Sequence, residues 1–325
     1  MRGVRVLLTG ATGFVGSHLV ERLCASGADA RCLVRAAGGP ARHPLPEAAV
    51  PVEGSLEDAA ALARACEGAE VIMHLAGAVK ERRPGDFTRV NVEGTRRLCA
   101  AAAAARGLRA FVHVSSLAAC GPSAADRPRE EDDPPAPVSA YGRSKLAAED
   151  CVRASGLPWV IARPPAVYGP RDRDLLMVFK CVARGFDLRV GPAVRSVSLI
   201  HASDLAAGLI ASAGAAPRST YFLCDAAPYP WDAVVAAMAA AFGTHLRRLR
   251  VPRWALLPAA LLSQSLGRIA GRPSIFNRDK VREIAHAHWT CSGARAAREL
   301  GFVPERTLEE GIAETAAWYR EHGRL

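Results

Sequence analysis

Short apolar runs alternate with longer amphipathic stretches over the first half of the chain, and small residues close most of the runs. Apolar runs bounded by turn residues predict buried strands, and the amphipathic stretches predict helices. Their alternation indicates an α/β protein with a doubly wound parallel sheet. The expected strands are 4–8, 28–35, 52–56, 70–75, 109–114 and 157–162, and the expected helices are 57–66, 87–106 and two that begin at Ser17 and Ser139.

The pattern becomes less regular after Pro170. Strands are expected at 197–201 and 220–223, and helices at 204–212, 232–242 and 307–319. We therefore divide the chain into a parallel-sheet unit, residues 1–165, and a smaller region, residues 166–325, that is partly interleaved with the sheet.

Composition narrows the possible function classes. The net charge is +10, but arginine carries nearly all of the positive charge in an alanine-rich chain, and no dense basic run is interleaved with aromatic residues. We therefore expect no nucleic-acid partner. Nine cysteines stand singly, without the spacing of a zinc site, so we expect reduced core thiols and no metal. No apolar leader precedes the first strand and no run is long enough to span a bilayer, so we expect a cytoplasmic protein.

The strongest single motif follows the first predicted strand. Gly10, Gly13 and Gly16 close strand 4–8 and open a helix. Such a turn directs free backbone N–H groups and the positive end of a helix dipole at one point, which suits a pyrophosphate. Glycine is required where a Cβ would obstruct the turn or the phosphates. The motif predicts a dinucleotide-binding (Rossmann) unit, and the alternative is a structural turn with no ligand.

The end of the next strand indicates which dinucleotide binds. NAD sites usually carry an acid there for the ribose hydroxyls, whereas NADP sites place an arginine near the 2′-phosphate. Strand 28–35 ends in Arg35, no acid is nearby, and Arg42 follows in the loop. We expect a preference for NADP(H), with NAD(H) as the other option. The alternative for Arg35 is a solvated surface arginine.

Three polar residues are candidates for chemistry at the nicotinamide end. Tyr141 and Lys145 are four positions apart on a predicted helix, so they share a face. A nearby ammonium lowers the pKa of a phenol and can also hold the cofactor ribose. Ser116 closes a neighbouring strand and could orient a substrate oxygen toward Tyr141. These roles fit proton transfer at an alcohol or carbonyl, coupled to hydride transfer. The alternative is a surface tyrosine beside a solvated lysine.

The motifs together resemble the extended short-chain dehydrogenases/reductases, of the NAD-dependent epimerase/dehydratase superfamily, over nearly the whole chain. They lie at 9–16, 74–77, 91–95, 114–116, 141–145, 163–170 and 299–304. The spacing of 25 positions from Ser116 to Tyr141 also matches the family. The resemblance implies that Ser116, Tyr141 and Lys145 are catalytic, with Asn91 as a supporting residue.

The same resemblance implies ligand contacts. Ser55 departs from the family, which often has an aspartate there for the adenine, and this weakens one cofactor contact. Substrate contacts are expected from Val79, Lys80, Ala118, Tyr168 and Arg171. Cofactor contacts are expected from Gly10, Thr12, Gly13, Phe14, Val15, Gly16, Arg35, Ser55, Leu56, Leu75, Ala76, Gly77, Tyr141, Lys145, Pro164 and Val167.

Two departures from the family bear on the substrate. Sugar-nucleotide members usually have an asparagine at the place of Ala166 and a diphosphate-binding arginine at the place of Val197. Arg195 lies two residues away and could substitute. Both losses argue against a nucleotide-diphosphate substrate. The remaining features resemble the branch of 3β-hydroxysteroid dehydrogenases, sterol-4-carboxylate dehydrogenases and dihydroflavonol-type reductases, which act on bulky, mostly apolar alcohols and ketones.

An apolar stretch in the second region is flanked by arginines. Residues 254–262 are almost wholly apolar, and the surrounding segment 247–268 holds Arg247, Arg248, Arg250, Arg253 and Arg268. One interpretation is a lid, or a peripheral membrane contact that collects a lipophilic substrate. The other, which we favour, is a core helix with solvated arginines around it. A small-residue run at 100–105 is a candidate helix contact, within the chain or across a homodimer.

We therefore expect an NADP(H)-preferring oxidoreductase that interconverts a secondary alcohol and a ketone on a steroid-like or polycyclic small molecule. A nucleotide-sugar epimerase or dehydratase is one alternative. A non-catalytic cofactor-binding subunit of a larger assembly is the other.

Overall fold

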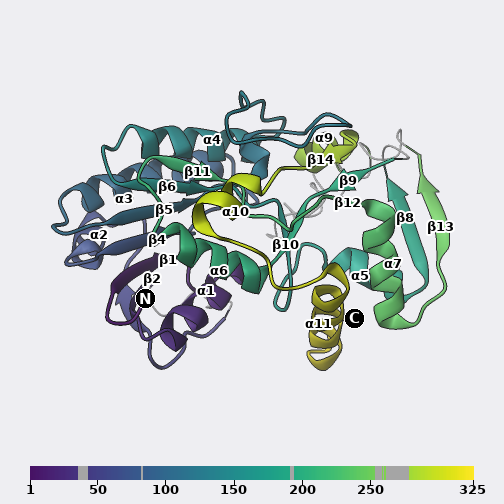
Figure 1. The fold of residues 1–325 in the computed structure, drawn as a ribbon, viewed down its shortest axis with the longest axis horizontal. Helices are drawn as coiled ribbons and strands as arrows, with labels where there is room; N and C mark the ends of the chain where they lie inside the picture. Colours follow the sequence, from purple (N-terminus) through teal and green to yellow (C-terminus); the bar gives the residue numbers. More distant parts are fainter. Residues whose placement is uncertain (36–42, 82, 191–193, 253–257, 259, 261–277) are drawn as a thin grey trace.

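The computed structural model describes residues 1–35, 43–81, 83–190, 194–252, 258, 260 and 278–325. Its centre is a parallel sheet of seven strands in the order β11-β6-β5-β4-β1-β2-β3 (Figure 1). The order runs outward from β1 in both directions, so the doubly wound parallel sheet expected from the sequence is confirmed. The strands are β1 (Arg5–Thr9), β2 (Asp29–Val34), β3 (Val50–Glu53), β4 (Val71–His74), β5 (Ala110–Val114), β6 (Trp159–Ala162) and β11 (Ser219–Tyr221).

Helices cover both faces of this sheet, because successive side chains of a strand point to opposite faces. On one face, Val6 and Leu8 share a buried cluster with α1 (Phe14–Ala25) and α6 (Ala202–Ser212). On the other face, Leu7 shares a cluster with α2 (Ala59–Cys66), α3 (Gly94–Ala103) and α4 (Ala140–Arg153). The apolar strands expected from the sequence therefore contribute to two hydrophobic cores, one on each face of the sheet.

The second region has a core of its own. The strand β7 (Ala166–Tyr168) pairs with β10 (Leu199–His201), and α5 (Leu176–Ala183), α7 (Trp231–Phe242) and α11 (Leu308–Glu321) contribute to the same apolar cluster. The helix α6 and the strand β11 return to the main sheet. The remaining elements are β8 (Phe186–Val190), β9 (Ser196–Val197), β12 (Tyr229–Pro230), β13 (Arg247–Val251), α9 (Arg278–Ala285), β14 (His288–Trp289) and α10 (Ala294–Leu300).

Two predicted segments differ in detail, and the acidic loop 130–133 is partly buried. The helix expected at 87–106 begins as a π-helical segment, Phe87–Glu93, and continues as α3 only to Ala103. The strand expected at 197–201 is divided, because β9 pairs with β12 and β14 whereas β10 pairs with β7. The acidic loop 130–133 is not wholly solvated: the side chain of Glu131 is 4% exposed, and it accepts a hydrogen bond from the backbone N–H of Phe222.

Some predictions fall on residues that the structure does not describe. Arg42 and almost all of the apolar stretch 254–262 lie outside the described residues, so the lid, membrane and core interpretations of that stretch stay predictions. Where the chain is described, no helix has both the length and the apolar character needed to cross a bilayer. The same ranges hold no cluster of His, Cys, Asp and Glu suited to a metal ion.

Candidate active site

The glycine turn after β1 is too tightly packed for side chains. A Cβ on Gly16 would lie 2.0 Å from the carbonyl oxygen of Gly10. Gly10 itself has a φ of +81°, and its Cβ would lie 2.7 Å from the backbone nitrogen of Ala76. Gly13 precedes α1, and no side chain caps it in the described structure. The bare turn leaves room and backbone N–H groups for an anion, so these residues fit a dinucleotide pyrophosphate.

The other predicted cofactor residues line the carboxyl ends of the sheet strands. Arg35 directly follows β2 and is exposed, and Ser55 and Leu56 follow β3 and are half-buried. Arg35 therefore stands on the edge where the adenosine half of a dinucleotide binds in sheets of this kind. Pro164 is buried and Gly77 is exposed, while Thr12, Phe14, Val15, Leu75, Ala76 and Val167 are half-buried.

Ser116, Tyr141 and Lys145 come together at the ends of β4 and β5. The Nζ of Lys145 donates a hydrogen bond of 2.7 Å to the carbonyl of Val114. It also lies beside Gly77, where a Cβ would be 3.7 Å from it. The hydroxyl of Ser116 lies close enough to the Tyr141 phenol to lower its pKa. The structure thus joins the three predicted catalytic side chains to the strand edge that carries the glycine turn.

Burial controls the protonation of Tyr141 and Lys145. Burial raises the pKa of the Tyr141 phenol, and the nearby Ser116 hydroxyl only partly offsets this. Burial also lowers the pKa of Lys145 to about 8, against the opposing charge of Glu149. The expected lowering of the Tyr141 pKa by Lys145 is not met here, because burial dominates and the ammonium is held on the Val114 carbonyl.

Asn91 fixes the loop that follows β4. Its Oδ1 accepts a hydrogen bond of 2.7 Å from the N–H of Ala78, and its Nδ2 donates to the Ala78 carbonyl at 3.0 Å. The same amide donates to Ser144 of α4 at 2.9 Å. Asn91 stands in the π-helical segment and is 2% exposed. These bonds hold the backbone at 77–78 against the helix that carries Tyr141 and Lys145.

His74 links the glycine turn to the segment of Asn91. Thr9 Oγ1 accepts from the N–H of Ala76, and Thr95 Oγ1 donates to the Asn91 carbonyl. The ring of His74 must therefore donate from Nε2 to Thr95, at 2.9 Å, and accept at Nδ1 from Thr9, at 2.7 Å. Burial lowers the pKa of His74 to about 3, which keeps the ring neutral. His74 is therefore a structural hydrogen-bonding residue.

The predicted substrate residues are dispersed. Val79 is 52% exposed in the loop after β4, and Lys80 in the same loop forms an ion pair with Asp174. Ala118 is 9% exposed, and its carbonyl lies under Gly142, where a Cβ would be 2.2 Å from the oxygen. The Lys80–Asp174 ion pair thus joins the loop after β4 to the segment before α5.

Tyr168 and Arg171 contact protein rather than an open surface. Tyr168 is fully buried, and its hydroxyl faces α11, where a Cβ on Gly311 would be 2.5 Å away. Arg171 has a φ of 77° and reaches α1, where it pairs with Glu21 at 2.6 Å. The structure therefore gives Tyr168 no surface for a substrate, because the residue belongs to the second core.

A buried ion pair behind the site was not foreseen from the sequence. Arg163, which follows β6, donates to both carboxylate oxygens of Glu149, at 2.9 and 2.7 Å. Ser115 and Arg153 also donate to Glu149. The side chains of Arg163 and Glu149 are 3% and 0% exposed. The sequence shows only that Glu149 shares a helix face with Lys145, four residues earlier, and it does not point to Arg163.

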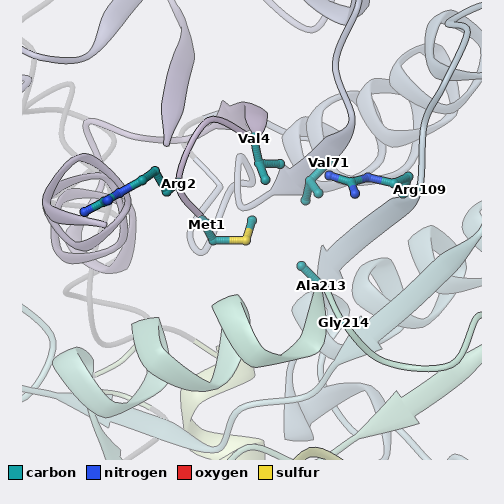
Figure 2. Close-up of a pocket in the computed structure, with 7 residues that line it drawn as sticks. All are labelled: Met1, Arg2, Val4, Val71, Arg109, Ala213 and Gly214. Atoms are coloured by element: carbon teal, nitrogen blue, oxygen red, sulfur yellow. The ribbon is translucent and has the colours of Figure 1, made fainter. Parts of the chain in front are cut away.

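The hollow drawn in Figure 2 is not this site. It has a volume of about 420 Å³ and lies at the amino ends of β1 and β4. Arg109 on its wall pairs with Glu70 at 2.9 Å. Ligands of open α/β sheets bind at the carboxyl ends instead. The lining residues are Met1, Arg2, Val4, Val71, Arg109, Ala213 and Gly214.

Comparison with known proteins agrees with this geometry. Residues 6–220 match the model of the NAD dependent epimerase/dehydratase family. The chain is 39% identical over 332 residues to the ceramide reductase of Caulobacter vibrioides, with 100% of this chain and 96% of that protein covered. It is 29% identical to the 4-hydroxy-2-methyl-3-oxo-4-farnesyl-3,4-dihydroquinoline-1-oxide ketoreductase of Stigmatella aurantiaca, with 95% of each covered. The solved structure of MoeE5 in complex with UDP-glucuronic acid and NAD has a TM-score of 0.75 and 26% identity, and the match covers 98% of this chain and 99% of that chain. The protein therefore belongs to the NAD-dependent epimerase/dehydratase family and is an enzyme of the extended short-chain dehydrogenase/reductase superfamily.

Proposed function

We propose that the protein is an NADP(H)-dependent ketoreductase that interconverts a ketone and a secondary alcohol on a bulky, mainly apolar molecule. The main support is the meeting of Ser116, Tyr141 and Lys145 beside the glycine turn. Two relatives are named as reductases of a ceramide and of a farnesylated dihydroquinoline, which favours carbonyl reduction and a lipophilic substrate. The substrate class is thus a polycyclic ketone or a long-chain lipid ketone.

Each residue of the site has a proposed role in cofactor binding or in proton transfer. A bound nicotinamide dinucleotide would supply the hydride. The turn of Gly10, Gly13 and Gly16 would hold its pyrophosphate, Arg35 its 2′-phosphate and Lys145 its ribose. In the direction of reduction, the Tyr141 hydroxyl donates a proton to the substrate oxygen. The raised pKa of Tyr141 suits this role, because it keeps the phenol protonated at neutral pH.

Ketone reduction is tested directly with purified protein and NADPH. We expect the cofactor to be oxidised in the presence of a steroid ketone or a long-chain 3-keto amide, and far more slowly with cyclohexanone, because only a large apolar body supplies binding energy to position the carbonyl. The measurement is the fall of NADPH absorbance for each ketone. No oxidation with any bulky ketone, together with thermal stabilisation by UDP-sugars, would instead identify a nucleotide-sugar enzyme.

The second-region residues weigh against a nucleotide-sugar substrate. Ala166 is exposed on β7 and offers a methyl group where sugar-nucleotide enzymes have an amide. Val197 is half-buried in β9 and carries no charge for a diphosphate. Arg195, the candidate substitute, lies over the ring of Trp231, with its guanidinium 6.0 Å from the ring centroid.

Arg35→Ala tests the preference for NADP(H). We expect the KM for NADPH to rise about 10- to 100-fold, which is the worth of a charge-assisted hydrogen bond to phosphate, while the KM for NADH stays within about twofold. Both constants are measured with the same ketone. Arg22→Ala removes an exposed arginine in the last turn of α1 and should change neither value. No change in either KM with Arg35→Ala would place Arg35 among the solvated surface arginines.

A further inference from the structure

The strands β8 and β13 form a separate two-stranded parallel ribbon. Figure 1 shows the ribbon at the end of the molecule opposite to α2 and α3. Its register pairs Phe186 with Arg247 and Leu188 with Leu249. Paired residues of neighbouring strands share a face, and residues two apart on one strand do so too. Phe186, Leu188, Arg247 and Leu249 therefore project from the same face of the ribbon.

The opposite face is charged and turned toward the protein. Asp187 is 2% exposed and lies 2.6 Å from Arg189 and 3.7 Å from Arg248. Asp232 of α7 pairs with the same two arginines. These ion pairs attach the ribbon to α7 through its polar face. The ribbon thus turns its polar face toward the protein, whereas a surface ribbon ordinarily buries its apolar face.

The apolar face is correspondingly open. Phe186, Leu188 and Leu249 are 39%, 42% and 45% exposed. Single exposed apolar residues are common on protein surfaces, but three neighbours on one face of the two-stranded ribbon form a patch, and such patches mark contact surfaces. The apolar face of the ribbon is therefore a candidate contact surface.

The charge around the patch selects the occupant. Arg247 lies on the apolar face and Arg250 lies on the opposite face of the same strand; both are exposed, and neither forms an ion pair within the described ranges. The side chain of Arg248 is 68% exposed at the ribbon's margin. A second copy would bring these arginines against their own equivalents, at an electrostatic cost. An anionic bilayer instead offers phosphates to the guanidinium groups and acyl chains to the apolar side chains, and the net charge of +10 adds attraction.

We propose that the apolar face of the β8–β13 ribbon docks on the surface of an anionic lipid bilayer. Leu188, Leu249 and Phe186 enter the boundary between headgroups and acyl chains, and Arg247 contacts the phosphates. The exposed Arg250 adds attraction to the anionic surface from the other face of the strand. This docking is independent of which ketone is reduced, since it involves none of the residues assigned to the reaction. It would place the enzyme on the surface from which a lipophilic substrate is drawn.

Vesicle flotation with the full-length protein tests the docking. We use vesicles of pure phosphatidylcholine and vesicles that contain about one third phosphatidylglycerol, at low and high salt. We expect the wild type to float with the anionic vesicles and to be released by salt. Leu188→Glu/Leu249→Glu and, separately, Arg247→Glu/Arg250→Glu should each lower the bound-to-free ratio at least tenfold. Ketone reduction in detergent solution should be unchanged in both variants.

Matched variants separate docking from general surface effects. Val50→Glu/Val303→Glu adds the same two charges at exposed apolar positions elsewhere, and Arg97→Glu/Arg106→Glu makes the same charge reversal on the side of α3; both should float like the wild type. If the glutamate pair on the ribbon impairs folding, Leu188→Ser/Leu249→Ser replaces it. Wild-type protein that fails to float, or ribbon variants that float normally, would overturn the docking. A ribbon variant that changes only the mass of the particle by light scattering would show a second copy as occupant, and one that changes only thermal stability would show a segment of the same chain.

Discussion

Tyr141→Phe is expected to lower kcat for reduction of the bulky ketone by about 10²- to 10⁴-fold, the usual worth of a positioned general acid. The change removes one hydroxyl and keeps the ring that packs against Phe87, with centroids 5.9 Å apart. The hydroxyl lies near that of Ser116, and burial keeps it protonated at neutral pH. Without it, only the Ser116 hydroxyl is left to donate a hydrogen bond to the alkoxide that forms on the substrate. The measurement is kcat with saturating NADPH, together with the thermal shift that NADPH produces.

The comparison with a second tyrosine makes this result specific. Tyr221 is also buried, and its hydroxyl donates at 2.9 Å to Glu299, which has no assigned role in the reaction. Tyr221→Phe removes an equivalent hydroxyl and should change kcat less than about twofold. NADPH should stabilise wild type, Tyr141→Phe and Tyr221→Phe alike. Near-normal turnover in Tyr141→Phe would remove Tyr141 from the reaction and leave the fold unaffected.

The sequence could predict the sheet because its signals are local. Each buried strand is a short apolar run closed by small residues, and the glycines at 10, 13 and 16 stand where the backbone has no space for a Cβ. The grouping of Ser116, Tyr141 and Lys145 could also be anticipated, because parallel strands deliver their carboxyl ends to one edge. These features depend on the apolar periodicity and on the order of strands and helices, both of which can be inferred from the sequence.

The features that were missed depend on contacts between distant segments. Nothing local shows that Glu149 would meet Arg163 or that Tyr168 would be covered by Gly311 of α11. The titration of Tyr141 was misjudged for the same reason, because the depth of its burial is a tertiary property. The π-helical start of the segment 87–93 likewise reflects a side chain, Asn91, that bonds across to Ala78 and Ser144.

Arg163→Met is expected to reduce the free energy of unfolding by about 3–5 kcal/mol, because it leaves the carboxylate of Glu149 buried without its bidentate partner. Burial alone would raise the pKa of Glu149, but the bonds from Arg163 and Ser115 and the charge of Arg153 outweigh it and hold the pKa below its ordinary value. A carboxyl with a depressed pKa in the folded state stabilises the fold above its unfolded pKa of about 4.3, and this contribution is lost as the pH falls through the folded value. The deficit of Arg163→Met should therefore be full at pH 7 and should shrink in strong acid. Urea unfolding at several pH values measures it.

Two further variants decide whether this pair, rather than bulk packing, is responsible. Arg96→Met breaks an exposed ion pair with Glu93, whose side chains are 58% and 35% exposed, and should cost at most about 1 kcal/mol. Glu149→Leu/Arg163→Met replaces both buried charges by apolar groups and should recover most of the loss, because no unpaired charge remains. A double variant as unstable as Arg163→Met would show that the aliphatic packing of Arg163 supplies the stability. Glu149 lies one helical turn beyond Lys145, and its partner Ser115 is the neighbour of Ser116. Recovery of stability without recovery of turnover would therefore show that the ion pair also positions Lys145 and Ser116 for the reaction.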